Sequence, residues 1–216
     1  MHSQGQAPEP SNPRGMPATD DEIREKYLER AIRELNAFTR ELQSCPHCPR
    51  GQLMPVLGSG HPQADIFLIK HSARPAEVEE GVAFYGRTGN ALMKSLKRLG
   101  IDPLAVYGTL CVKCPVLEPV MADAACVARL VQELHIVQPK IIVVMGPDAL
   151  SVVNDLEVPL SQPLSAEPGV VQRYTPSIEA LYAPNIDEAL DEEGAKREFW
   201  TAFRALGEWW ADLPPY

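Results

Sequence analysis

The stretch KIIVVMG, residues 140–146, decides the fold class of this chain. Its five apolar residues run without interruption and include four β-branched residues in a row. This composition is typical of a strand that is buried on both faces, and such strands occur mainly in parallel sheets covered by helices. Pro147 follows at once and predicts the first turn of a short helix over residues 148–154. The stretch therefore predicts an α/β fold.

Strand and helix patterns alternate over the rest of the chain. Short apolar runs predict further strands, and apolar residues spaced three and four apart predict amphipathic helices between them. The alternation predicts a three-layer sandwich, in which a central, mostly parallel four-stranded sheet is flanked by helices. The other predicted strands cover residues 66–69, 106–112 and 178–182, and the other predicted helices cover residues 21–42, 86–99, 123–137 and 195–210.

Residues 1–19 differ in composition from the rest of the chain. They hold four prolines and show no apolar period, so we expect a disordered tail followed by a single domain over residues 20–216. No apolar run is long enough to cross a bilayer, and the N-terminus lacks a signal pattern. We therefore expect a cytoplasmic, monomeric protein without membrane contact.

The spacing of the five cysteines suggests a metal centre. Cys45 and Cys48 form a C-x-x-C motif, while Cys114 and Cys126 lie at predicted element boundaries. Four thiolates are the ligand set of a cubic iron-sulfur cluster or of a structural zinc, and the spacing alone favours neither. The alternative is that Cys111 and Cys126 are small buried apolar residues, as free cysteines often are.

Polar residues follow three of the predicted strands. Lys70, His71 and Arg74 come in the segment KHSARP, Lys113 follows the strand 106–112, and the segment APN follows the strand 178–182. Because the carboxyl ends of parallel strands meet at one edge of a sheet, and ligands gather there, this edge is a candidate binding site.

The charge distribution limits which partners are expected. A formal net charge of -9 argues against tight, nonspecific binding to nucleic acid, and the segment NIDEALDEE, residues 185–193, holds five acidic residues and no basic one. Lys70, Arg74, Arg87 and Lys113 would form a small basic rim at the strand ends. Such a rim leaves binding of a single strand or of a nucleotide open, and ordinary solvated surface charge is the alternative.

Four motifs together resemble one known family. They are CPHC at residues 45–48, ADIFLIKHSARPAEVEEGVAFYGRTGNAL at 64–92, LCVKC at 110–114 and ACVARLVQELHIVQPKIIVVMG at 125–146. In this order and spacing they resemble the iron-sulfur branch, family four, of the uracil-DNA glycosylase superfamily. The resemblance implies a protein of DNA repair that excises a base by hydrolysing the N-glycosidic bond, with DNA, single-stranded or damaged, as its partner.

The resemblance also assigns the cysteines. It implies that Cys45, Cys48, Cys114 and Cys126 bind a 4Fe-4S cluster, which leaves Cys111 as the spare and favours iron-sulfur over zinc. The loop between Cys114 and Cys126 lacks the arginines and the asparagine that the family carries there, so the resemblance does not extend to a contact of this loop with DNA.

Phe84 matches the ring that stacks on the excised base in this family. Tyr85, Gly86 and Arg87 follow it in the same motif, and Lys70 begins the neighbouring KHSAR motif. The resemblance implies that Phe84, Lys70, Gly86 and Arg87 bind the substrate base after it has flipped out of the stack. The alternative for Phe84 is an ordinary core residue.

Three positions depart from the family's catalytic pattern. His71 stands where the family has a glutamate, Leu110 where it has the asparagine that reads uracil, and Ala183 where it has the histidine that stabilises the departing base. Two hypotheses follow. In the first, His71 is catalytic, since an imidazole with a pKa of about 6.5 suits a general base or an anion-stabilising donor. In the second, the chain is an inactive family member that binds nucleic acid or a protein.

Overall fold

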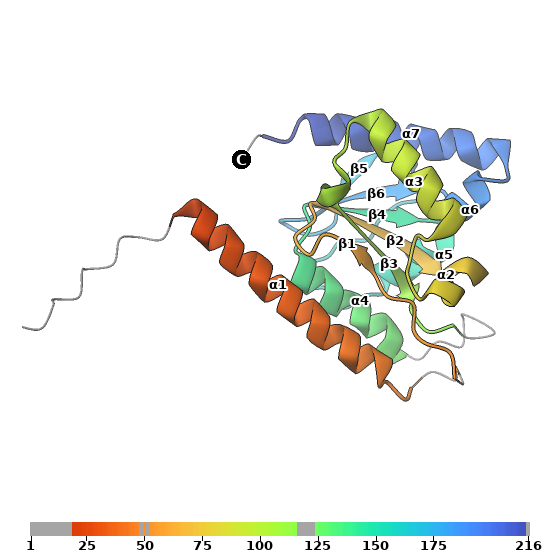
Figure 1. The fold of residues 1–216 in the computed structure, drawn as a ribbon. Helices are drawn as coiled ribbons and strands as arrows, with labels where there is room; N and C mark the ends of the chain where they lie inside the picture. The colour runs from red at the N-terminus through yellow and green to blue at the C-terminus, as the bar shows by residue number, and fades with distance from the viewer. Residues whose placement is uncertain (1–18, 48–49, 51, 116–123, 215–216) are drawn as a thin grey trace, which may run out of the picture.

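The computed structural model describes residues 19–47, 50, 52–115 and 124–214 (Figure 1). Residues 1–18 of the predicted tail lie outside these described residues, as does Cys48, and Thr19, the last residue of the predicted tail, caps the first helix. Within them, no helix is long and apolar enough to cross a membrane.

A single mixed sheet forms the middle layer of the molecule. Its strand order is β1-β3-β2-β4-β6-β5, and the four central strands run parallel, which confirms the predicted parallel sheet. The prediction of only four strands is wrong, because short antiparallel strands close both edges. With two and three residues, these edge strands are too short to show any alternation in the sequence. The bounds are β1 Ser59–Gly60, β2 Ile66–Ser72, β3 Val106–Val112, β4 Ile141–Met145, β5 Val171–Arg173 and β6 Glu179–Ala183.

Helices cover both faces of the sheet, as predicted (Figure 1). On one face α4 and α5 contribute to a core cluster with Phe67 and Ile69 of β2, and α1 packs against α4. On the other face α3 and α7 contribute to a second cluster with Ile66 and Leu68. The bounds are α1 Asp20–Gln43, α2 Pro75–Glu80, α3 Gly86–Leu99, a 3-10 turn η1 Pro103–Ala105, α4 Ala124–Val137, α5 Pro147–Asn154, α6 Ile186–Ala189 and α7 Glu193–Ala211.

Strand β2 fixes where the side chains at its carboxyl end point. Its residues alternate between the two core clusters, because successive side chains of a strand lie on opposite faces. Lys70 therefore falls on the face of α3 and α7, and His71 falls on the face of α4 and α5. The sequence motif KHSAR is thus divided between the two sides of the sheet.

Candidate functional site

Lys70 is the centre of a buried ion cluster at the carboxyl end of β2. Its side chain is only 1% exposed. The ammonium Nζ donates to Oε2 of Glu77 at 2.6 Å and to Oδ2 of Asp187 at 3.0 Å. Breaking such a pair leaves an uncompensated buried charge, so the cluster holds α2 and α6 to the tip of the sheet.

Glu77 also holds the loop that carries Phe84. Its carboxylate accepts the backbone N–H of Phe84 at 2.6 Å and that of Arg74 at 2.7 Å. Phe84 adopts a φ of 57°, and its ring lies so close to Gly108 that a Cβ there would approach the ring to 2.6 Å. The Nζ of Lys70 lies 5.6 Å from the ring centroid of Phe84. Lys70 therefore lies over the ring on which the family resemblance places the excised base.

Asp187 is a buried carboxylate with three donors around it. It accepts from the hydroxyl of Thr88 at 2.6 Å and from Lys70, and it pairs with Nε of Arg74 at 3.2 Å. Burial alone would raise the pKa of Asp187, but the charge of Lys70 and the hydrogen bonds from Thr88 and Lys70 outweigh it, so the pKa lies below its ordinary value. The side chain is thus a fixed negative charge at neutral pH.

A cavity of about 390 Å³ opens beside Asp187, between α2, α3 and α6. Tyr85, which is 47% exposed, lines it together with Thr88 and Arg87. Arg87 donates to Oδ1 of Asp191 at 2.7 Å and to the carbonyl of Leu190. The cavity thus presents an exposed aromatic ring and an ionised carboxylate to the same space.

A second buried ion cluster lies at the end of β3. Lys113 is fully buried; its Nζ pairs with Oε2 of Glu133 and donates to the hydroxyl of Thr109 at 2.8 Å. The hydroxyl of Tyr107 donates to Oε1 of Glu133 at 2.9 Å, and burial followed by the charge of Glu133 raises the pKa of Tyr107. This cluster anchors α4 to β3 directly before Cys114.

The structure brings together two of the four predicted cluster ligands. Cys114 and Cys126 are buried in contact with each other. A hydrogen bond from Cys114 and the backbone N–H groups of Lys113 and Cys114 outweigh burial and lower the pKa of Cys126 to about 5. Cys45 is buried just past the end of α1, and among the described residues no three ligand-type side chains form a metal site.

The remaining cysteine lies in the core. Cys111 is fully buried with the apolar residues of the α4 and α5 face, and burial raises its pKa to about 12. A thiol in this setting packs as a small apolar residue.

The structure separates one of the residues that the sequence placed in one site. Because side chains alternate along β2, His71 lies on the opposite face of the sheet from Phe84 and Lys70, whereas Leu110 and Ala183 are buried on the same face as Lys70, at neighbouring positions of the sheet. The predicted basic rim does not form, because Lys70 and Lys113 are buried and ion-paired.

Two of the residues that complete the site could not be recognised from the sequence. Glu77 belongs to the acidic stretch AEVEE, residues 76–80, and Asp187 belongs to the acidic run that was expected to repel phosphate. Asp187 is 117 residues from Lys70 in the chain, so no local pattern links the two. The only signal in the sequence was that a lysine continues an apolar strand pattern. A lysine buried in such a strand needs a carboxylate partner.

The central parallel strands, the helices on both faces and the cavity at the carboxyl ends of the strands define an α/β protein with a candidate binding site at one edge of its sheet. The uracil DNA glycosylase superfamily pattern matches residues 57–204, so the chain belongs to this superfamily. The resemblance predicted from the motifs is thereby confirmed.

Three curated relatives are named type-4 uracil-DNA glycosylase. The protein of Sulfurisphaera tokodaii is 33% identical over 119 residues, which cover 52% of this chain and 54% of the relative. The protein of Pyrobaculum aerophilum is 28% identical over 123 residues, covering 53% and 60%, and that of Thermotoga maritima is 29% identical over 126 residues, covering 54% and 64%. The matched segment thus spans between about half and just under two thirds of these relatives' length.

Proposed function

We propose that this protein acts on DNA as a base-excising hydrolase of the uracil-DNA glycosylase kind. Membership of the superfamily supports the reaction class, and the cavity between Tyr85 and Asp187 supports its place. In the reaction, the oxygen of water bonds to C1′ of the sugar as the bond from C1′ to the base nitrogen breaks. The electron pair leaves with the base, and the proton released by the water neutralises it.

Tyr85 takes the stacking role in this proposal. Lys70 covers one face of Phe84, whereas Tyr85 is 47% exposed and lines the cavity. Aromatic rings stack on any flipped base because every base has a π-face. Phe84 then supports the wall behind Tyr85, held by its hydrogen bond to Glu77.

Asp187 supplies the negative charge that the family's glutamate would supply. Its lowered pKa keeps it ionised, and it lines the cavity. A fixed carboxylate stabilises the positive charge that develops on the sugar as the base departs. His71 is the alternative catalytic residue, as a general base for the water or as a donor to the departing base anion, proposed from its place in the motif.

The same proposal includes a 4Fe-4S cluster on Cys45, Cys48, Cys114 and Cys126. The contact of Cys114 with Cys126 and the stabilised thiolate of Cys126 fit such a donor set. When bound, the cluster would act as a structural staple between the end of α1, the end of β3 and the start of α4. Iron and sulfide near four per chain in anaerobically purified protein support it, and zinc alone contradicts it.

Oligonucleotides with one uracil or one hypoxanthine, single and double stranded, test the activity. Alkali cleaves the strand wherever an abasic site has formed, so excision appears as a shorter fragment on a gel. We expect a product from at least one substrate and a loss of about 100-fold to 1000-fold in rate for Asp187→Asn. If His71→Ala abolishes the product and Asp187→Asn does not, His71 is the catalytic residue. No product from any substrate contradicts the enzymatic proposal.

A second function is favoured by the position of Lys70. Since its ammonium lies 5.6 Å from the ring centroid of Phe84, Lys70 covers a face on which the family resemblance would stack the base, as expected of a member that binds nucleic acid without cleaving it. In that case the protein shifts oligonucleotides on a gel at low salt, releases them steeply as salt rises, and forms no abasic product.

A further inference from the structure

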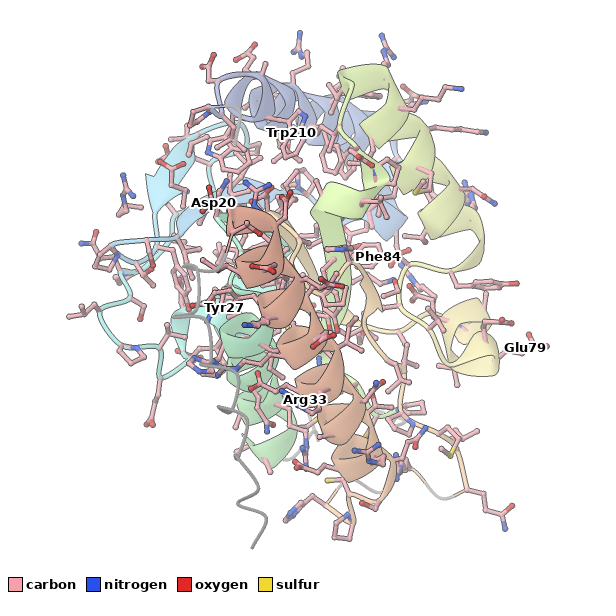
Figure 2. All side chains as sticks on the ribbon, turned by 60° about the vertical axis from the view of Figure 1, so that its left-hand side comes forward. Asp20, Tyr27, Arg33, Glu79, Phe84 and Trp210 are labelled. Atoms are coloured by element: carbon pink, nitrogen blue, oxygen red, sulfur yellow. The ribbon has the colours of Figure 1, made fainter. Side chains whose placement is uncertain are left out.

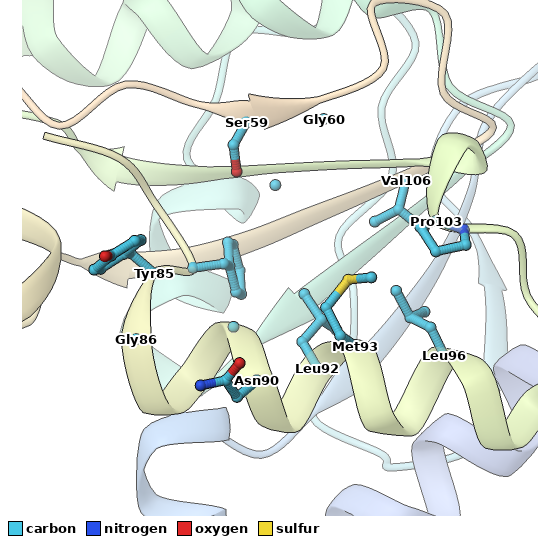
Figure 3. A pocket seen from close by; sticks show the side chains of 13 residues that line it. Ser59, Gly60, Tyr85, Gly86, Asn90, Leu92, Met93, Leu96, Pro103 and Val106 are labelled. Atoms are coloured by element: carbon cyan, nitrogen blue, oxygen red, sulfur yellow. The ribbon is translucent and has the colours of Figure 1, made fainter. Parts of the chain in front are cut away.

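A hollow runs along α3 and leads away from the cavity beside Asp187. It consists of two adjoining cavities of about 460 and 680 Å³, which share Asn90, Met93 and Pro103. Figure 3 shows the first of them, with Met93 and Leu96 of α3 on one wall and Ser59 on the other. Tyr85 lines both this hollow and the cavity of Asp187, so the two adjoin at this residue.

The floor of the hollow is apolar and partly open to solvent. Leu92, Leu96 and Val106 are buried beneath it, and Met93 lies 47% exposed at its edge. Exposed apolar side chains that line a hollow mark a binding surface more often than scattered ones do. The floor therefore suits the flat faces of bases or a similar apolar group.

The rim of the hollow is basic, although the chain as a whole carries a negative net charge. Helix α3, GRTGNALMKSLKRL, holds four basic residues and no acidic one, in a chain of net charge -9. Arg87 pairs with Asp191 and Arg98 lies 4.7 Å from the ring of Trp200. Lys94 and Lys97 are exposed and have no carboxylate within ion-pair distance among the described residues.

The other basic residues near the site are already neutralised. Lys70 is buried between two carboxylates, and Arg74 pairs with Asp187. The single acidic side chain on the described lining of the hollow, Asp102, accepts the backbone N–H of Leu104 at 2.9 Å. Lys94 and Lys97 are therefore the basic residues near the site that can contact phosphates.

We propose that the hollow along α3 binds single-stranded DNA. Lys94 and Lys97 contact the phosphates, and the bases lie on the apolar floor beside Met93. This inference rests on the proposed function. With the excised base in the Asp187 cavity, the DNA strand continues past Tyr85 and enters the hollow. A single strand fits and a duplex does not, since only unpaired bases can turn their faces to a protein floor.

Binding of an undamaged single-stranded oligonucleotide tests the proposal without any excision step. Fluorescence anisotropy of a labelled strand gives the binding constant at several salt concentrations. For Lys94→Ala with Lys97→Ala we expect weaker binding, and a slope of log K against log salt that is smaller by about 1.4, since each phosphate left without its lysine lowers the slope by about 0.7. For Met93→Ser we expect weaker binding with an unchanged slope, because an apolar contact releases no counterion.

The matched control removes two exposed charges from the other side of the sheet. Lys26→Ala with Arg33→Ala, on α1, changes the net charge equally and should leave both affinity and slope unchanged; Figure 2 shows Arg33 on this helix. An unchanged slope in the Lys94 and Lys97 variant overturns the proposal, and so does equal affinity for a duplex of the same sequence. Because the oligonucleotide holds no damaged base, this test measures binding alone, and its result stands even if the protein excises no base.

Discussion

Replacing Lys70 by Met should destabilise the protein strongly. The substitution keeps an unbranched side chain of similar length, so the packing of the stem is largely preserved. It removes the ammonium that lies 2.6 Å from Glu77 and 3.0 Å from Asp187, both of them buried. Removing one partner of a buried ion pair costs about 3–5 kcal/mol, because the remaining charge stays buried and uncompensated.

The expected destabilisation is large enough to be measured in two ways. For a chain of this size each kcal/mol moves the midpoint of thermal unfolding by about 2–4 °C, so Lys70→Met should lower Tm by about 6–20 °C. Urea unfolding, followed by the fluorescence of the tryptophans in α7, gives the free energy of unfolding directly. Both measurements use the full chain as purified, with any bound metal.

A double-mutant cycle and an exposed control make the reasoning refutable. Asp187→Asn should cost less in the Lys70→Met protein than in the parent protein, because the charge that it removes has by then lost its main partner. Arg30→Met on α1 breaks an exposed pair with Glu34 and should leave the unfolding midpoint nearly unchanged. If Lys70→Met costs less than about 1 kcal/mol, the buried ion cluster does not exist as described.

The remaining predictions concern packing, pH and the second ion cluster. Gly108→Ala should lower the unfolding free energy by about 1–3 kcal/mol, measured in urea, because its Cβ would lie 2.6 Å from the ring of Phe84; no change would contradict the close approach. Asp187 has a lowered pKa when folded, so its contribution to stability is complete above its ordinary value of 3.8 and is lost as the pH falls further. Thermal scans from pH 5 to pH 2 should therefore show a smaller acid loss for Asp187→Asn than for the parent protein, and equal losses would refute the shift. Tyr107→Phe should cost about 1–3 kcal/mol, because Glu133 loses a buried donor; an unchanged urea midpoint would show that Glu133 does not need this hydroxyl.

The acidic run NIDEALDEE shows why the charges in a short stretch of sequence did not predict the charge of the folded surface. The run places five acidic residues after the last strand and therefore predicts a surface that repels phosphate. In the fold, Asp187 turns inward to Lys70 and Arg74, and Asp191 pairs with Arg87. The same contacts neutralise the basic residues that were expected to bind phosphate. Charge at this edge therefore stabilises the fold, and the proposed contact with DNA rests on the exposed Lys94 and Lys97 of α3.

The sequence alone determined the parallel central sheet, its helical layers and the family. Each of these properties is local: the apolar run KIIVVMG, the helical spacing and the four motifs can each be recognised within a few dozen residues. Only the tertiary structure decided which face of β2 carries Lys70 and which carries His71, and that Glu77 and Asp187 enclose the lysine. The physical reason is that a buried charge is stabilised by partners that the fold brings close to it. Such partners lie far apart in the chain, so they form no periodic pattern in the sequence.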